Sequence, residues 1–173
     1  MASKYTANWW YYLLAIGRLS LNIKNGGRYQ LKGLSTTNRA GLVPYYIDNG
    51  ILRMLFMVPS KAGFGGVLPQ IAKGKQDLGE TIEAAAIREG SEELGIKADN
   101  VRNLCFAKKD RVEGRDEYFD LYIFVAEIKK PKGLGKPTKE TKEVVWLTYD
   151  EFRAGGRVDQ HTLISDVVNF VGD

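Results

Sequence analysis

Three glutamates, Glu89, Glu92 and Glu93, have a spacing that predicts chemistry. They follow the pattern i, i+3, i+4, and at 100° per residue they fall within about 100° of arc on one face of a helix. Three like charges on adjacent turns destabilise an isolated helix. A bound divalent cation reverses that repulsion, because carboxylate oxygens are ligands that suit Mg²⁺ or Mn²⁺. The alternative interpretation is a solvated acidic face without a ligand.

The composition leaves this chemistry to carboxylates. The 173-residue chain has one cysteine, Cys105, and one histidine, His161. A single cysteine forms neither an intrachain disulfide nor a thiolate metal site, and a lone histidine leaves little room for a triad or a zinc site. Cys105 lies in an apolar run, and we expect it to be a buried small hydrophobic residue. Acid–base or metal chemistry must therefore rest on Asp and Glu.

The charges are distributed unevenly along the chain. The net charge is +4, which alone is weak evidence for a nucleic-acid partner. Between Gly74 and Ile96, however, six acids stand against Lys75 and Arg88, so this segment carries −4 and the remainder carries +8. An acidic patch inside a basic protein suits a metal site that receives a polyanion.

The residues around the glutamates extend the pattern to Gly74, Glu80, Arg88, Glu89, Glu92, Glu93, Gly95 and Ile96. This spacing resembles the Nudix box of the Nudix hydrolase family, and the resemblance runs from about Ala40 to Val171. Gly90 is a departure, because the family has an aliphatic residue there. Glycine inside a helix costs about 1 kcal/mol relative to alanine. A bulky neighbour, for example from the N-terminal extension, would have to fill the gap.

The resemblance implies roles for these residues. Glu89, Glu92 and Glu93 are implied as ligands of one to three metal ions, Mg²⁺ with Mn²⁺ as a substitute, and the backbone carbonyl of Gly74 as a further ligand. Glu89 is also implied to activate the water. Arg88 is implied to orient the carboxylates through an ion pair, and Glu80 to brace the loop against the helix.

Many family members add a carboxylate from a later loop, about six residues before an aromatic residue on the last strand. Glu140 stands six residues before Trp146, with Glu143 and Glu117 as the alternatives. We call residues 129–142 the lysine loop, since they include six lysines and Glu140 is the only acid before Lys142. These lysines, with Lys73 and Lys75, are candidate phosphate contacts. The alternative is that they are solvated surface lysines.

The expected function is Mg²⁺-dependent hydrolysis of the diphosphate linkage of a nucleoside diphosphate joined to another moiety. The basic segments favour a dinucleoside polyphosphate or a nucleoside triphosphate, with a 5′-triphosphorylated RNA as the alternative substrate. A non-catalytic Nudix-like nucleotide-binding module is the other alternative, although such a module would normally have lost a box glutamate. The family's ADP-ribose hydrolases tend to have a proline about fifteen residues after the box, where this chain has Arg111-Val112. One diadenosine polyphosphate group has a tyrosine near that position, and the nearest tyrosine here, Tyr118, comes later. Neither signature is present.

Positioning these residues requires a helix and a sheet. Thr81 is a predicted N-cap for a helix that ends at Leu94 before Gly95, with Ile87, Ser91 and Leu94 directed toward the core. Strands are predicted at Leu42–Ile47, Ile51–Val58, Val101–Ala107, Tyr118–Ile128 and Val144–Leu147, with helices at Tyr149–Ala154 and Thr162–Phe170. Strands interleaved with helices imply an α/β fold, a Nudix-like α/β/α sandwich with a mixed sheet.

The N-terminal 39 residues are predicted to be an extension to a Nudix domain at residues 40–173. A helix at Ala7–Gly17 is predicted, followed by a hairpin turning at Asn25-Gly26-Gly27. The aromatic and apolar residues of the extension need burial on the core or across a partner. We therefore expect a homodimer. No stretch approaches the ~18 apolar residues that span a bilayer. We therefore expect a cytoplasmic protein with no membrane partner.

Overall fold

The computed structural model describes residues 21–22, 30–31, 37–114 and 118–172. Its centre is a six-stranded sheet in the order β6-β7-β3-β4-β8, with β5 paired to β3. The strands are β3 (Asn38–Asp48), β4 (Ile51–Pro59), β5 (Ala72–Lys75), β6 (Val101–Glu113), β7 (Tyr118–Ile128) and β8 (Thr141–Leu147). The β3–β7 pair is parallel and the other pairs are antiparallel, so the predicted mixed sheet is confirmed.

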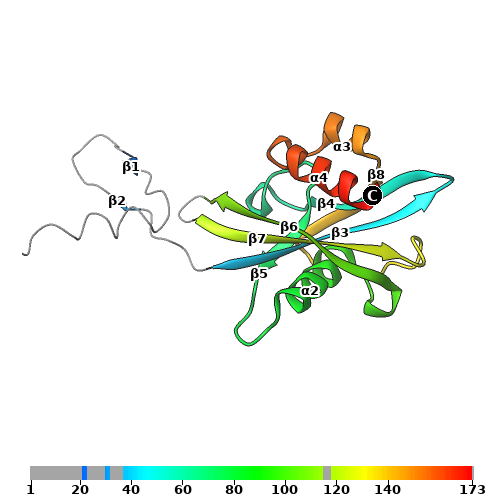
Figure 1. Ribbon diagram of the computed structural model, residues 1–173, viewed down its shortest axis with the longest axis horizontal. Helices are drawn as coiled ribbons and strands as arrows, with labels where there is room; N and C mark the ends of the chain where they lie inside the picture. Colours follow the sequence, from blue (N-terminus) through cyan, green and yellow to red (C-terminus); the bar gives the residue numbers. More distant parts are fainter. Residues whose placement is uncertain (1–20, 23–29, 32–36, 115–117, 173) are drawn as a thin grey trace, which may run out of the picture.

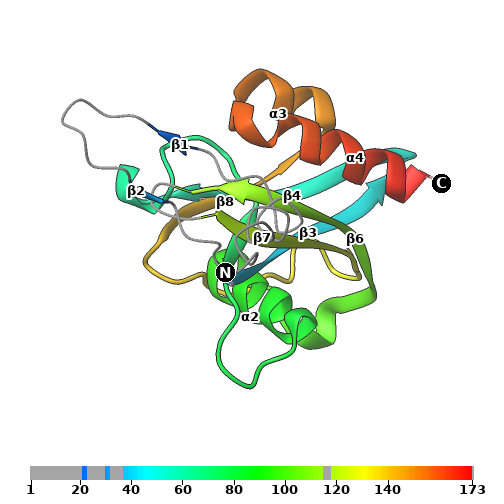
Figure 2. The ribbon, with the colours of Figure 1, turned by 60° about the vertical axis from the view of Figure 1, so that its left-hand side comes forward.

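Helices cover both faces of this sheet. Figures 1 and 2 show α2 (Ile82–Leu94) on one face and α3 (Tyr149–Gly155) with α4 (His161–Gly172) on the other. Single 3₁₀ turns lie at Ala62–Phe64, Ala98–Asn100 and Val158–Gln160. Each face has its own apolar cluster, one around Leu42, Leu55 and Leu94 and the other around Phe56 and Phe152. The α/β/α sandwich predicted from the sequence is confirmed.

The helix that carries the glutamates has the predicted ends. The Thr81 hydroxyl accepts a hydrogen bond from the backbone N–H of Ala84 at 3.1 Å, and Gly95 ends the helix with φ of 69°. Leu94 is buried and Ile87 is half-buried, but Ser91 is exposed, so its predicted direction is wrong. Small residues face the sheet instead, because α2 lies close against it.

Gly90 is one of those small residues. A Cβ on Gly90 would lie 2.5 Å from Cδ2 of Leu42, which is fully buried on β3. Among the described residues, Leu42 of β3 therefore fills this space, and most of the N-terminal extension lies outside them. Glycine is required here by close packing between α2 and β3.

Four strands and one side chain differ from the predictions. The short strand β5 was not predicted, and β6 continues to Glu113 instead of ending at Ala107. Strands β3 and β8 each begin earlier than predicted. Cys105 is exposed, which corrects the expectation of burial. The pairing of β6 with β7 shifts its register on both sides of Cys105 and Phe106, so the apolar run does not map onto one buried face.

The N-terminal region contributes two short described strands. β1 (Leu21–Asn22) and β2 (Gln30–Leu31) pair antiparallel, as the predicted hairpin requires. The predicted helix at Ala7–Gly17 and the turn at Asn25-Gly26-Gly27 lie outside the described residues. Within the part of the chain that the structure describes, no helix is long and apolar enough to cross a membrane.

Candidate active site

A cleft of about 460 Å³ lies where α2, β5 and the lysine loop meet. It brings together seven of the residues that the sequence singled out, Lys73, Gly74, Glu89, Glu92, Glu93, Lys139 and Glu140, and adds Arg39 and Thr138. We call it the glutamate cleft. Lys75 and Arg88 do not line it. Lys75 is exposed at the end of β5, and its backbone carbonyl accepts a hydrogen bond from Arg88 Nη2 at 2.8 Å.

The absence of a side chain at Gly74 lets the Glu89 carboxylate pack against the sheet. Gly74 on β5 pairs with Ala40 on β3, and a Cβ at position 74 would overlap the Glu89 carboxylate. Glu89 is 8% exposed, and this burial raises the pKa of its carboxyl above the ordinary value despite the neighbouring Arg88. The glycine of the box is thus explained by geometry, because any side chain would displace the carboxylate.

Arg88 joins the loop before α2 to the carboxylates on it. Its guanidinium donates from Nε and Nη2 to the two Glu80 oxygens, each at 3.1 Å. Nη1 donates to Glu89 Oε1 at 2.7 Å and reaches Glu92 Oε2 at 3.5 Å. The hydrogen bond from Arg88 lowers the pKa of the Glu80 carboxyl. The fork geometry of arginine allows one side chain to orient three carboxylates.

Glu93 lies deeper than Glu92 and has a different environment. Its Oε2 accepts a hydrogen bond from the backbone N–H of Lys73 at 2.8 Å. Burial raises the pKa of the Glu93 carboxyl to about 7, and the nearby Glu89 and Glu140 charges add to the rise. Burial also lowers the pKa of the Lys73 ammonium, although Glu93 opposes that change. The cleft therefore contains desolvated charge of both signs.

The lysine loop brings Glu140 to the cleft. The backbone N–H of Thr138 donates to the Glu92 carbonyl at 2.7 Å, and the Thr141 hydroxyl donates to the Glu93 carbonyl at 2.7 Å. The Ser60 N–H donates to the Glu140 carbonyl at 2.8 Å. Of the alternatives, Glu143 is more than half exposed and pairs with Lys142, and Glu117 lies outside the described residues.

The donor set fits a hard divalent cation. In the arrangement of the described residues, no three Asp, Glu, His or Cys side chains are close enough together to hold a metal ion. The carboxylates instead turn to Arg88 and to the Lys73 N–H. All the candidate ligands are oxygens, however, and the buried carboxyls carry raised pKa values that a cation would reverse.

Arg39 is a residue of the cleft that the sequence did not single out. It comes from the start of β3, and its guanidinium carbon lies 4.5 Å from the centroid of the Phe119 ring. Its Nε is buried and has no hydrogen-bond partner among the described residues. The predicted strand began at Leu42, which assigned Arg39 to the extension. Three more residues at the start of that strand would have placed Arg39 on the sheet, where it pairs with Lys75.

Comparisons with known proteins identify the family and the fold. A family model described as a NUDIX domain matches residues 42–167. The fold is similar to that of the C. elegans Ap4A hydrolase in a binary complex, at 20% identity over 79% of this chain and 98% of that chain, with a TM-score of 0.67. It is also similar to RenU, a Nudix hydrolase from M. smegmatis, at 21% identity over 76% of this chain and 85% of that chain, with a TM-score of 0.61.

A third similar structure is the NUDIX domain of Shewanella oneidensis NrtR complexed with ADP ribose. The identity is 14% over 79% of this chain and 89% of that chain, and the TM-score is 0.63. No curated protein matches the chain. At these identities the solved structures establish the fold, and the match of the family model establishes the family.

Proposed function

The chain belongs to the Nudix family of pyrophosphohydrolases, and from that premise we propose that it is a Mg²⁺-dependent enzyme acting on a dinucleoside polyphosphate or a nucleoside triphosphate. The single observation that carries the proposal is the glutamate cleft. It gathers Glu89, Glu92, Glu93 and Glu140 opposite the cations Arg39 and Lys73. A metal-bridged diphosphate needs anionic groups for the metal and cationic groups for the phosphates, and this cleft contains both.

Each residue of the cleft has a proposed role. The proposed ligands of the metal are Glu89, Glu92, Glu93, Glu140 and the carbonyl of Gly74. A metal ion held there would neutralise phosphate charge and lower the pKa of a water. Glu89, whose buried carboxyl lines the cleft, is also the proposed acceptor of the proton of the attacking water. Arg88 and Glu80 act as positioning residues, because neither lines the cleft and Arg88 contacts the carboxylates that do.

Arg39 and Lys73 are the proposed phosphate contacts inside the cleft. The Arg39 guanidinium lies on an aromatic face and has a buried N–H without a partner among the described residues, so a phosphate oxygen would satisfy it. The Lys73 ammonium loses solvation on burial, and a polyanion would compensate for that loss. Lys75 remains a weaker proposal because it is exposed outside the cleft.

The preference for a dinucleoside polyphosphate has support from a neighbour. The C. elegans structure that shares this fold is an Ap4A hydrolase, and the volume of the cleft lies within the range of sites for small ligands. A non-catalytic module is disfavoured because all the box glutamates are present and line or support the cleft. We further propose a cytoplasmic homodimer. Sedimentation at high concentration as a 19.4 kDa monomer would contradict the dimer.

A panel of nucleotide substrates with Mg²⁺ tests the function. The expected result is release of phosphate or nucleoside monophosphate from diphosphate-linked nucleotides, with loss of activity in EDTA and recovery when Mg²⁺ or Mn²⁺ is added. Arg88→Gln should lower both activity and stability, because it leaves the buried Glu89 and half-buried Glu80 carboxylates without their partner. Activity that survives thorough chelation, or no hydrolysis of any diphosphate-linked nucleotide, would overturn the proposal.

A further inference from the structure

Two buried glutamines, Gln70 and Gln160, have no role in the proposed chemistry. Gln70 is 2% exposed and ends the segment between β4 and β5. Gln160 is 6% exposed and belongs to residues 156–160, which join α3 to α4 and which we call the connector. A buried amide side chain costs free energy unless it is hydrogen-bonded. Both amides are hydrogen-bonded, and their bonds join segments that lie 87 and 89 residues apart in the sequence.

The backbone that leads into β5 changes its partner strand where Gln160 contacts it. Gln70 exchanges two backbone hydrogen bonds with Met57 of β4, at 2.9 and 3.0 Å, and from Ala72 onward the chain pairs with β3 instead. Ile71 lies between these two pairings and is 1% exposed. Its N–H donates to Oε1 of Gln160 at 2.9 Å. Gln160 therefore satisfies a buried backbone donor at the point where the chain leaves one strand for another.

The N–H groups of Ile71 and Lys73 point to the same edge of this extended segment. Alternate residues of a strand turn their backbone groups to the same side, about 6.6 Å apart. Within the described residues β5 pairs with β3 alone, so no strand covers its other edge. On that edge the Ile71 N–H bonds to Gln160, and the Lys73 N–H bonds to Oε2 of Glu93 at 2.8 Å. The connector and a carboxylate of the glutamate cleft therefore hold neighbouring positions of one strand edge.

Arg157 of the connector fixes the segment that precedes β5. Its Nη1 donates to Oε1 of Gln70 at 2.8 Å and to the carbonyl of Gly65 at 2.7 Å. Its backbone N–H donates to the carbonyl of Pro69 at 3.0 Å. Asp159 accepts from Nε of the same guanidinium at 2.9 Å and so orients it. Three of these hydrogen bonds end on the segment between β4 and β5, and together they hold that segment against the connector.

We propose that Gln160 and Arg157 are positioning residues for the glutamate cleft. They set the position of β5, so that the Lys73 N–H reaches the Glu93 carboxylate. The proposal rests on the proposed function and adds to it two residues that lie outside the cleft. If β5 shifts, the hydrogen bond to Glu93 lengthens and that carboxylate turns away from its place among the other glutamates. The effect belongs to the hydrogen bonds of the connector and not to the apolar packing of α3 and α4.

The first test needs neither metal nor substrate. Gln160→Met removes the acceptor for the Ile71 N–H at nearly constant shape. In EDTA, the Lys73 amide proton is followed in a proton–nitrogen correlation spectrum below the melting temperature. It should shift upfield in Gln160→Met, because its hydrogen bond to Glu93 lengthens. Arg157→Lys, at a half-buried position, keeps the charge but loses the planar fork, and it should shift the same resonance in the same direction by less.

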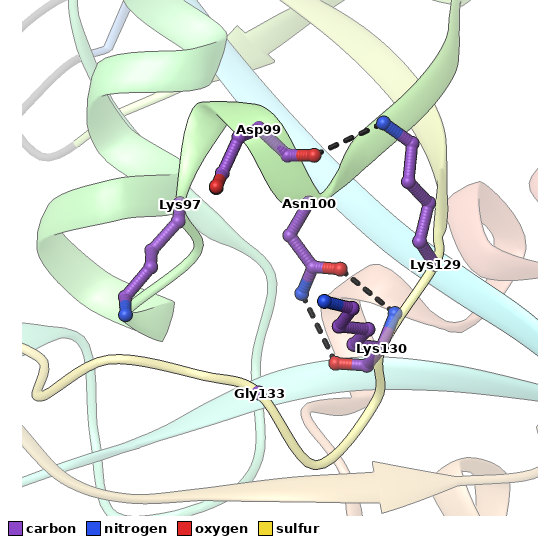
Figure 3. A pocket seen from close by; sticks show the side chains of 6 residues that line it. All are labelled: Lys97, Asp99, Asn100, Lys129, Lys130 and Gly133. Atoms are coloured by element: carbon purple, nitrogen blue, oxygen red, sulfur yellow. Dashed lines mark hydrogen bonds between the residues drawn. The ribbon is translucent and has the colours of Figure 1, made fainter.

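Asn100 provides a matched control. It is also 6% exposed, and its amide donates to the Lys130 carbonyl at 3.0 Å and accepts from the Lys130 N–H at 2.7 Å (Figure 3). Between Lys130 and β8 the lysine loop has its own hydrogen bonds to α2, from the Thr138 N–H and the Thr141 hydroxyl. Asn100→Leu should therefore lower the free energy of unfolding but leave the Lys73 amide resonance unchanged.

Metal binding and kinetics extend the test. Mn²⁺ alone, titrated by electron paramagnetic resonance, should bind to Gln160→Met about 10-fold more weakly than to wild type, the lower end of the usual cost of losing an outer partner of a metal ligand. With Mg²⁺ and the best nucleotide of the panel, kcat should fall by a similar factor. The KM for the nucleotide should stay unchanged, because neither Gln160 nor Arg157 lines the cleft. Asn100→Leu should change none of these values.

The outcomes separate this proposal from the proposed function. An unchanged Lys73 resonance and an unchanged Mn²⁺ affinity in folded Gln160→Met would overturn the positioning role, even if wild type hydrolyses nucleotides. Equal changes in Asn100→Leu would also overturn it, because loss of stability alone would then explain them. If wild type hydrolyses no nucleotide but Gln160→Met shifts the resonance and weakens Mn²⁺ binding, the proposed function fails and the positioning role stands.

Discussion

The two faces of the sheet are packed by side chains of different size and polarity. On the α2 face the helix contributes small residues, Ala85, Ala86 and Gly90, together with a buried carboxylate. On the opposite face large side chains meet, and Phe152 of α3 stacks on Phe56 of β4 with ring centroids 4.2 Å apart. Small residues let α2 approach the strands closely, and that approach brings Glu89 against Gly74.

The α2 face carries the proposed catalytic residues, and the α3/α4 face carries packing that stabilises the fold. Desolvated carboxylates and an internal glycine cost free energy of folding, and the α2 face contains both. The α3/α4 face contains apolar packing and a capping box at Thr148 and Glu151, which satisfies the backbone at the start of α3. A protein can tolerate an unfavourable ligand set on one face of a sheet when the other face supplies the folding free energy. Four changes test this division.

Glu93→Gln should have the largest effect, and it should act on catalysis. The amide keeps the shape and can still accept the hydrogen bond from the Lys73 N–H, but it removes the charge of a proposed metal ligand. We expect kcat to fall by roughly 10³-fold, equivalent to about 4 kcal/mol. In EDTA the variant should melt at or above the wild-type temperature, because burial of that charge is unfavourable. Near-normal turnover, or loss of activity only through unfolding, would show that Glu93 is not a catalytic ligand.

Phe152→Ala should have a comparable free-energy effect on stability alone. Removing a fully buried aromatic ring leaves a cavity beside Phe56 and costs about 3–5 kcal/mol of unfolding free energy. The site lies on the other face, so kcat below the melting temperature should stay within twofold of wild type, a ratio worth about 0.4 kcal/mol. The control is Phe106→Ala, at a half-exposed ring, which should change stability much less. A fall in kcat for the folded Phe152 variant would mean that the two faces are coupled.

Gly74→Ala tests the close approach between β5 and α2. The new methyl group overlaps the Glu89 carboxylate, which must rotate away. We expect kcat/KM to fall about 10–100-fold, the usual cost of misplacing a metal ligand. Gly63→Ala is the control, since its Cβ meets nothing within 4 Å. If Gly74→Ala retained full activity, the position of Glu89 against β5 would not matter for catalysis.

Gly90→Ala should have the smallest effect, and its sign should depend on Leu42. Alanine gains about 1 kcal/mol of helix propensity, but a methyl group 2.5 Å from a buried Leu42 Cδ2 costs about 1–3 kcal/mol. A net loss of about 1 kcal/mol is expected in chemical denaturation. In a Leu42→Ala background the same change should become stabilising, because the clash is gone. The absence of this reversal would show that Leu42 does not explain the glycine.

Much of the fold followed from local sequence. The Asp48-Asn49-Gly50 turn fixed the β3–β4 hairpin, because Asn49 and Gly50 adopt the positive φ that a two-residue turn needs. Thr81 and Gly95 fixed the ends of α2 in the same way. Strand β5 was missed because four residues around Gly74 carry no alternating pattern, and they form a strand only by pairing with β3.

The sequence by itself determined which residues are proposed for the site, since the spacing of Gly74, Arg88, Glu89, Glu92 and Glu93 is a property of one loop and one helix. Only the tertiary structure decided what surrounds it. The place of Arg39 in the cleft, the burial that raises the pKa of Glu93, and Leu42 as the reason for Gly90 all depend on segments distant in the chain. Helical periodicity fixes which side chains share a face, but contacts between a helix and a sheet depend on packing distances that no local pattern encodes.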